Sequence, residues 1–402
     1  IPINNVNANI KAWIELPNGQ AMDDNQANDT IETTSLGCNQ VLNGTYLVGS
    51  SSADFQTLND AFQVLTSCGV SGPVVLQMLP GTYNGFSINQ SFIGCNQSHT
   101  VTITSSTGIA SDVVFQSSGV VLNLANTSDL VFTHITLDAS SGTRAIQLGN
   151  ACENIEINQC VIKANPTASS TTYAGIYKSS TGIVNNIRIL HNRIDGGYYN
   201  IYFYGGDGTS DYGTNIIING NMLSNAYYYG GYFYYTDFIS LSDNIVSSRL
   251  SNTYNYFYGL YSVYCNVESL SGNKIRSFNP SINYPYGIYL NYVNYNNTHT
   301  SGLIANNDII LNANSTSSAI YVSNSRVNIM HNSVWMDGSG ANRLIYLNPI
   351  EDYMVKVKNN NLVTTSTSGY ALYLSNTNYV GTSLFMDYNN YYAAYIGYAN
   401  GN

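Results

Sequence analysis

A six-residue pattern, apolar-x-x-Asn-x-apolar, recurs through the C-terminal two thirds of the chain. It first appears as ILHNRI at 189–194 and last as MDYNNY at 386–391. Two earlier copies carry Ile135 and Cys160 in place of the asparagine. The ten anchors span 254 residues in nine intervals, a mean period of about 28 residues, which indicates stacked copies of one small unit. The anchoring asparagines are Asn192, Asn221, Asn244, Asn273, Asn307, Asn332, Asn360 and Asn389.

A second pattern, small-apolar-Tyr-apolar, lies between successive anchors. GIYL at 287–290 is typical, and GGYF at 230–233 places Gly231 where other copies have Ile or Leu. In an extended strand the two aliphatic residues of GIYL share one face, and Tyr289 takes the other. If the aliphatic side chains point inward, eight outward tyrosines at a coil spacing of ~4.8 Å form a stripe of roughly 34 Å. The stripe consists of Tyr177, Tyr202, Tyr232, Tyr261, Tyr289, Tyr321, Tyr346 and Tyr373.

Short strands with β-branched residues and Asn/Gly turns exclude helical repeats. The interval between anchors varies, which fits a coil of three short strands whose turns tolerate insertions. Over about residues 113–395 the repeats resemble the right-handed parallel β-helix of pectate-lyase-like proteins and bacterial surface proteins. The fold class we predict is therefore all-β, a right-handed parallel β-helix of about ten coils. This fold carries lyases, hydrolases, adhesins and stalks alike, so it does not define a function.

The repeated asparagine is expected at a bend, where it tolerates left-handed backbone geometry and can hydrogen-bond neighbouring backbone. Stacked in register, such amides can also bond the coils above and below. Cys160 and Ile135 cannot do so. The ladder is therefore predicted to begin after them.

The N-terminal part divides into two segments. Residues 45–112 are predicted to contain the cap and the first coils, with Phe55, Leu58, Phe62 and Leu65 on one face of a helix that Ser52 or Asp54 could cap. A helix there would cover the open first coil, as solenoids require. The stretches ADFQTLNDAF and PGTY resemble the beginning of pectin-methylesterase-like β-helix proteins. The repeats are assigned to residues 113–402.

Residues 1–44 differ from the rest and look like the last strand of a preceding Ig-like module plus a linker. They are similar to what precedes β-helix regions in very large secreted proteins of the Bacteroidetes group, a resemblance that implies type IX secretion. The chain begins IPINN without an initiator Met. We interpret it as a mature fragment of a longer precursor.

Charged residues make up 9% of the chain, against roughly 25% in average domains. Asn, Ser, Thr, Gly and Tyr take their place, a profile that suits an extracellular or cell-surface all-β protein. The net charge is −10 with 13 Lys plus Arg, which argues against nucleic acid as a partner because no basic stripe can neutralise phosphates. The sequence contains no apolar run of ~18 residues, so it predicts no transmembrane segment.

The six cysteines are compatible with an oxidising compartment. The sequence contains no CxxC motif, which argues against a zinc or redox site. Cys68 and Cys95 flank the first strand and its return, so they are the first disulfide candidate. Cys160 replaces a repeated asparagine and is expected to be a buried free thiol. Cys152 and Cys265 lie four coils apart and should not pair.

Catalysis on a β-helix needs carboxylates from adjacent coils, either with Ca²⁺ and an Arg or Lys base or as a pair flanking a sugar bond. The position before each anchor contains no stacked pair of carboxylates. His191 and His331 occupy this position five coils apart, ~24 Å, too far to share a metal. No catalytic residue is assigned on this basis. The residues before the anchors are His191, Gly220, Asp243, Gly272, Asn306, His331, Asn359 and Tyr388.

Two weaker candidates for chemistry remain. Asp207 and Asp211 in the loop GGDGTSDYG could bind Ca²⁺, although the loop lacks the further oxygen ligands of a recognisable cage and reads more simply as a solvated turn. Arg249 is a conceivable base near Asp237 and Asp243. No other cofactor is implied.

Three functions remain open. The leading hypothesis is a non-enzymatic extracellular β-helix module, adhesive or structural, with the tyrosine stripe as a flat aromatic face for glycans or solid surfaces. The alternatives are a polysaccharide lyase or glycoside hydrolase on the same scaffold, and a subunit of an extracellular filament. The expected partners are glycans or cell surfaces, flanking domains of the same precursor, and copies of the chain itself.

Overall fold

The computed structural model describes residues 40–206, 211–251, 254–295, 300–350, 354–375 and 383–399. It also describes the backbone of β1 (Ala8–Trp13) and β2 (Thr30–Ser35), which pair antiparallel as a separate two-stranded sheet. The predicted Ig-like segment lies largely outside the described residues. No helix in the described part of the chain is long and apolar enough to cross a membrane.

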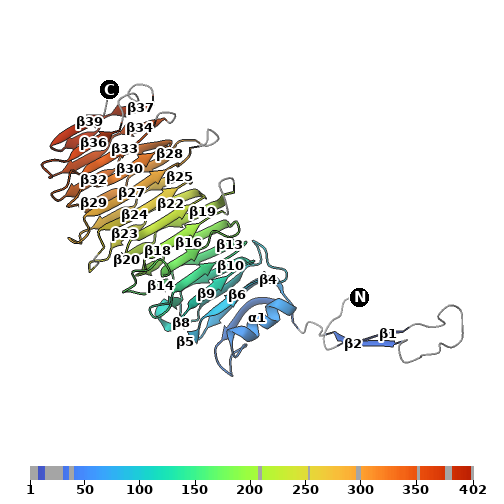
Figure 1. Cartoon of the computed structure of the whole chain (residues 1–402). Coiled ribbons are helices and arrows are strands. Elements are labelled where there is room, and N and C mark those ends of the chain that lie inside the picture. The colour runs from blue at the N-terminus through green and yellow to red at the C-terminus, as the bar shows by residue number, and fades with distance from the viewer. Residues whose placement is uncertain are drawn as a thin grey trace.

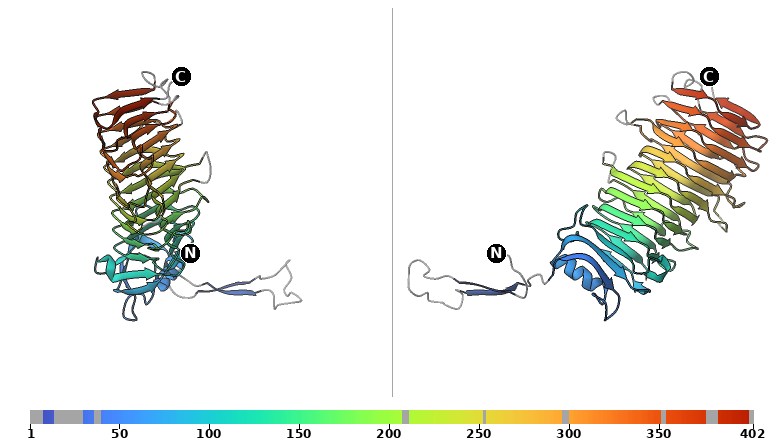
Figure 2. Two further views of the ribbon diagram at one scale, coloured as in Figure 1. Left: turned by 60° about the vertical axis from the view of Figure 1, so that its left-hand side comes forward. Right: turned by 180° about the vertical axis from the view of Figure 1, so that it is seen from behind.

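The other strands form three parallel sheets that run the length of an elongated stack (Figures 1 and 2). Each strand pairs with its counterpart one coil earlier and one coil later. The first sheet consists of β3 (Leu42–Val48), β4 (Val70–Met78), β7 (Val101–Ser105), β10 (Ser128–Thr133), β13 (Glu153–Asn158), β16 (Asn185–Leu190), β19 (Gly213–Asn219), β22 (Thr236–Ser242), β25 (Asn266–Ser271), β28 (Gly302–Ala305), β31 (Val327–Met330), β34 (Val355–Lys358) and β37 (Leu384–Asp387).

The second and third sheets contain the shorter strands. The second consists of β5 (Gly81–Asn84), β8 (Val113–Gln116), β11 (Thr136–Asp138), β14 (Val161–Lys163), β17 (Arg193–Asp195), β20 (Met222–Ala226), β23 (Ile245–Ser248), β26 (Lys274–Ser277), β29 (Asp308–Asn312), β32 (Ser333–Asp337), β35 (Asn361–Thr364) and β38 (Asn390–Tyr392). The third consists of β6 (Phe86–Ile88), β9 (Val120–Leu124), β12 (Arg144–Leu148), β15 (Ala174–Lys178), β18 (Tyr199–Tyr204), β21 (Tyr229–Tyr234), β24 (Tyr256–Val263), β27 (Tyr284–Asn291), β30 (Ser318–Ser323), β33 (Arg343–Leu347), β36 (Tyr370–Leu374) and β39 (Tyr395–Ala399).

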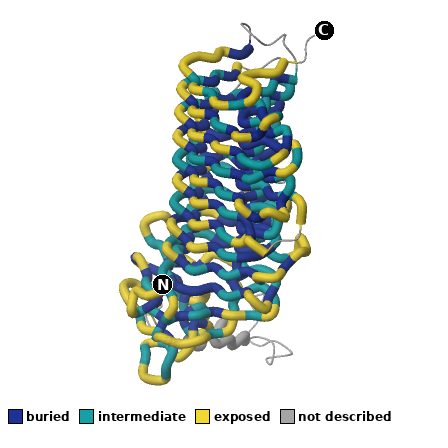
Figure 3. Tube along the Cα trace, turned by 90° about the vertical axis from the view of Figure 1, so that its left-hand side faces the viewer, coloured by how far each residue is buried: buried dark blue, intermediate teal, exposed yellow. Residues whose placement is uncertain are grey.

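The predicted all-β parallel solenoid is confirmed, with about twelve coils rather than about ten. The first coils, formed by β4 to β9, lack the asparagine pattern and were not counted from the sequence. Buried positions alternate with half-buried and exposed ones along every coil (Figure 3). The inward side chains therefore stack into one continuous apolar core.

From Leu122 to Leu372 the inward row of the third sheet is Ile or Leu except at Gly231, and the core explains the exception. The ring of Phe233, two residues later, occupies the space that the row's side chain would fill. A Cβ on Gly231 would lie 2.4 Å from that ring. Within this strand the Phe233 ring therefore fills the core volume that a side chain at position 231 would otherwise occupy.

The short helix α1 (Leu58–Ser67) packs next to β3 at the N-terminal end of the stack (Figure 1). Its N-cap is Thr57, which forms a capping box with Asp60, so the prediction that Ser52 or Asp54 caps the helix is wrong. Asp54 instead accepts a hydrogen bond from the backbone N–H of Leu47. Phe55, expected on the helix, forms a β-bridge with Val48 before the helix begins. A 3₁₀ turn, η2 (Ala110–Asp112), precedes β8.

The asparagine ladder lies in the turn between the first and second sheets. Asn244 is representative: its Oδ1 accepts from the backbone N and the Nδ2 of Asn221, at 3.0 Å each. Its own Nδ2 donates to the carbonyl of Ile218 and to the Oδ1 of Asn273. The same bonds repeat up to Asn389. The first rung is Asn192, which accepts from the backbone N of Cys160, as predicted from the substitution there.

The left-handed residue in each turn is the one before the ladder asparagine, not the asparagine itself. This corrects the expectation that the asparagine adopts that geometry. All eight preceding residues have positive φ, from 52° at His191 to 69° at Gly220. Gly, Asn and Asp, which make up five of the eight, adopt this region readily. In each turn the first residue therefore provides the left-handed backbone, and the asparagine after it provides the hydrogen bonds of the ladder.

The cysteines depart from one prediction. Cys68 is disulfide-bonded, whereas Cys95 is a free, half-buried thiol, so the pairing of these two residues is wrong. Flanking the same strand does not bring two Cβ atoms to the roughly 4 Å that a disulfide requires. Cys160 is a buried free thiol as predicted, and its burial raises its pKa to about 12.

We predict that Asn273→Ala lowers the free energy of unfolding by about 3 kcal/mol, because two buried donors of Asn244 lose their acceptor. Asn389→Ala, at the half-buried end of the ladder, should cost about 1 kcal/mol. The exposed Asn361→Ala serves as a control for loss of an amide. Urea unfolding monitored by circular dichroism measures the three values. Equal losses at the middle and the end would contradict the buried ladder.

Candidate functional site

The eight tyrosines of the predicted stripe lie in one row on the outer face of the third sheet. Each pairs in register with the next, from Tyr177 opposite Tyr202 to Tyr346 opposite Tyr373, and Tyr398 continues the row. We call this the central row. Each of these side chains is half-buried, except that of Tyr398, which is slightly more exposed.

A second row, missed from the sequence, runs beside it. Tyr199, Tyr229, Tyr258 and Tyr286 pair in register, each three residues before a member of the central row. We call this the lateral row. Together with further tyrosines in the flanking turns, the two rows form a continuous tyrosine surface over the middle coils. Those further tyrosines include Tyr198, Tyr204, Tyr227, Tyr228, Tyr234, Tyr254, Tyr256 and Tyr284.

Two consecutive buried residues separate the rows within each strand, as Gly259 and Leu260 do between Tyr258 and Tyr261. This local break in alternation brings tyrosines three residues apart onto the same face. The first of the two is glycine in three of these four strands, and a Cβ on Gly259 would lie 2.6 Å from the carbonyl oxygen of Gly287; between Tyr199 and Tyr202 the position is filled by the buried Asn200. The repeated spacing Tyr-small-apolar-Tyr is thus the sequence signal that could have revealed the lateral row.

Stacking covers the ring faces of the central row. From Tyr177 to Tyr321 the neighbouring ring centroids are 4.4–5.2 Å apart, with planes within 14° of parallel. Rings that stack at the coil spacing cover one another and present edges and hydroxyls to solvent. The surface is therefore not the flat aromatic face expected from the sequence. Tyr346 breaks the stack, being nearly perpendicular to both Tyr321 and Tyr373.

Two arginines lie against rings of the central row, one at the start of the stacked segment and one beyond the break at Tyr346. The Arg144 guanidinium carbon lies 3.5 Å from the ring centre of Tyr177, and that of Arg343 lies 3.9 Å from Tyr373. Both arginines occupy the lateral row, Arg144 before Tyr199 and Arg343 after Tyr286. Cation–π contacts of this kind are attractive. They cover ring faces that stacking leaves open.

The tyrosine surface is uncharged over a wide pH range. Burial, together with neighbouring hydroxyls, raises the pKa of Tyr198 and of Tyr202 to about 12. The pKa values of Tyr229 and Tyr232 rise further for the same reasons. The hydroxyl of Tyr234 hydrogen-bonds with its neighbours in the central row. At neutral pH the surface therefore offers neutral hydroxyls that both donate and accept hydrogen bonds.

The residues considered for chemistry do not form a site. Asp207 lies outside the described residues, and Asp211 is exposed. Within the described ranges no group of three or more His, Cys, Asp or Glu side chains could hold a metal. His191 and His331 are exposed turn residues in separate coils.

Arg249 is a structural residue rather than a base. Its guanidinium is buried and donates to the carbonyls of Asn225, Ala168 and Gly197 at 3.0–3.1 Å. Burial lowers the pKa of Arg249, and Tyr227 and the Asp195 carboxylate oppose that shift. The side chain turns inward to join three loops and is held by these carbonyls, so it is not placed to act as a base.

The comparisons with known proteins are distant. The chain matches no model of a known protein family, and no curated protein matches it in sequence. The Dettilon tailspike protein is 13% identical, with a TM-score of 0.42 over 78% of this chain and 63% of the tailspike. This chain thus spans less than two thirds of that protein.

Two enzymes of known structure show similar partial likeness. A lacto-N-biosidase from Eubacterium ramulus is 9% identical, with a TM-score of 0.37 over 88% of this chain and 68% of that one. A pectin methylesterase from Erwinia chrysanthemi is 12% identical, with a TM-score of 0.26 over 87% and 93%. Superpositions this weak carry no argument about function. The fold assignment here depends on the strand pairing itself.

We predict that the protein loses stability steeply above pH 10. Tyrosines whose pKa is raised in the folded state stay neutral there, whereas in the unfolded chain they ionise near pH 10. The unfolded state then binds fewer protons, so stability is constant below that pH and falls as pH rises. Urea midpoints between pH 7 and 11.5, with tyrosinate absorbance of the folded protein, measure this. Full tyrosinate formation near pH 10 without unfolding would contradict it.

Proposed function

We propose that the chain is an extracellular, non-enzymatic attachment module. Its tyrosine surface binds an extended glycan or a solid material. The observation that carries the proposal is the tyrosine surface itself, two adjoining rows of aromatic side chains with outward hydroxyls on one sheet. Large exposed aromatic patches on soluble proteins mark interaction sites. Tyrosine combines apolar area with a hydrogen-bonding group at low entropic cost.

The regular spacing of the hydroxyls favours an extended partner. Neighbouring coils are ~4.8 Å apart, so a ligand that lies along the stack meets a hydroxyl at every coil. Each contact is weak, and affinity comes from many contacts made together. A polysaccharide chain or a polymer surface fits this better than a small ligand does, because the face is not a concave pocket.

We predict that Tyr232→Ala combined with Tyr261→Ala weakens retention on the target surface while leaving the fold intact, because the two adjacent rings supply both area and hydroxyls. Retention is measured by co-sedimentation with insoluble cellulose, chitin and other polysaccharides. The double Tyr→Phe variant at the same positions keeps the stack and removes the hydroxyls, so it separates the two contributions.

Tyr392→Ala, an exposed tyrosine on the second sheet, is the matched control and should retain binding. Circular dichroism verifies the fold of each variant. Equal retention of the Ala double variant and the wild type would reject the tyrosine surface as the binding site. Release of soluble sugars from any polysaccharide would replace the proposal with the lyase or hydrolase alternative.

A further inference from the structure

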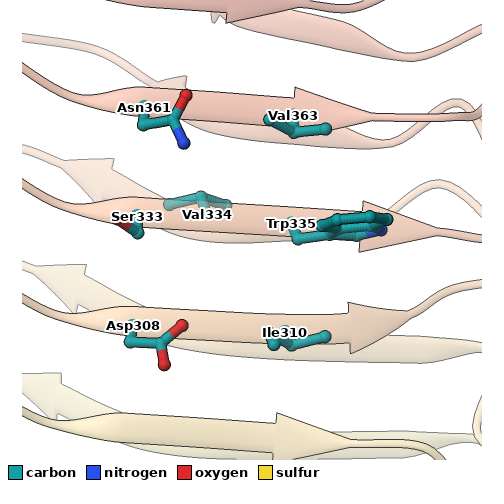
Figure 4. Close-up of a pocket in the computed structure, with 7 residues that line it drawn as sticks. All are labelled: Asp308, Ile310, Ser333, Val334, Trp335, Asn361 and Val363. Carbon is teal, nitrogen blue, oxygen red and sulfur yellow. The ribbon is translucent and has the colours of Figure 1, made fainter.

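The second sheet carries a groove that is separate from the tyrosine surface. It lies on the outer side of β29, β32 and β35 and has a volume of about 110 Å³. Two rows of side chains form its walls (Figure 4). Asp308, Ser333 and Asn361 lie one above another, and Ile310, Trp335 and Val363 do so further along the strands.

The apolar wall is a local feature of these coils. In the two preceding coils the same row holds Ser247 and Arg276, and it becomes apolar at Ile310. Trp335 then stands in the middle of the apolar stretch with 46% of its surface exposed. A Val or Ile at this position would pack equally well between the two aliphatic neighbours, so packing alone does not explain a half-exposed indole. It does offer an apolar platform to a ligand.

The polar wall contains groups with unused hydrogen-bonding capacity. Arg276 pairs with one carboxylate oxygen of Asp308, Oδ2, and donates to the Asp308 backbone oxygen at 2.6 Å. The other carboxylate oxygen, the Ser333 hydroxyl and the Nδ2 of Asn361 have no partner among the described residues. The Oδ1 of Asn361 is already engaged by Asn390 at 2.9 Å. An acceptor, a hydroxyl and a donor thus line one side of the groove.

We infer that this groove binds a single neutral sugar ring, with its C–H face on Trp335 and its hydroxyls on Asp308, Ser333 and Asn361. The two walls are two residues apart along the strands, about 7 Å, which accommodates one pyranose. Asp308 and Asn361 lie two coils apart with Ser333 between them, so the acceptor and the donor face hydroxyls on opposite sides of one ring and the Ser333 hydroxyl lies between them. The Asp308 charge is already balanced by Arg276, which favours a neutral sugar over a uronic acid.

The test uses tryptophan fluorescence, because the chain contains two tryptophans, Trp13 and Trp335. In a Trp13→Phe background the emission reports on Trp335 alone. The probes are the methyl glycosides of glucose, galactose, mannose, xylose and N-acetylglucosamine, with glucuronate as the charged comparison. We expect a saturable change in emission with at least one neutral glycoside, and weaker binding of glucuronate.

Variants identify the groove as the site. The Ser333→Ala/Asn361→Ala double variant should weaken affinity by about tenfold or more, the effect of about 1.4 kcal/mol. Trp335→Ala should abolish binding measured by calorimetry, and Trp335→Phe should retain part of it. Leu303→Ala, an exposed side chain on the first sheet outside both surfaces, should leave binding unchanged. The inference is overturned if none of the five glycosides binds, or if Trp335→Ala binds as the wild type does.

Discussion

Stacking of coils in strict register, one strand spacing apart, is the constraint on which every other feature depends. The buried asparagine ladder shows how the constraint is met. Each side chain accepts two hydrogen bonds from one neighbouring coil and donates to the other, so a shift of one residue would break bonds on both sides. Buried amides without partners cost about 1–3 kcal/mol each. The ladder therefore selects one register over its alternatives.

The same register determines what happens inside and outside the stack. Residues at equivalent positions of successive coils meet, so a repeated Ile forms a core column and a repeated Tyr forms a stacked row. Stacked aromatic pairs contribute about 0.5–1.5 kcal/mol beyond their buried area. The central row therefore stabilises the fold with its ring faces while its edges and hydroxyls remain at the surface.

Period and alternation were sufficient to predict the solenoid, the ladder and the central row. They could not reveal the lateral row, because Tyr258 and Tyr261 share a face only through a local break in alternation. Assignment of the left-handed residue was off by one position, although Gly220 and Gly272 marked the right one. The Trp335 groove forms where register places side chains of three coils next to one another. The loops between these coils differ in length, so sequence spacing alone does not reveal the groove. The pairing of Cys68 depended on three-dimensional proximity, which no repeat encodes.

The ends of the stacked tyrosines explain why the surface has no flat aromatic platform. An interior ring has a neighbour on each face, but a terminal ring would expose one face to water. Arg144 lies over that face of Tyr177, and Arg343 lies over Tyr373 and Tyr346, where the stack is broken. The two guanidiniums are seven coils apart, ~34 Å. From Tyr177 to Tyr321 each ring stacks on its neighbours in the row, so a ligand meets ring edges and neutral hydroxyls there. A half-exposed indole is found instead on the second sheet, at Trp335, which is why the two surfaces suit different parts of a carbohydrate: an extended chain on one and a single ring on the other.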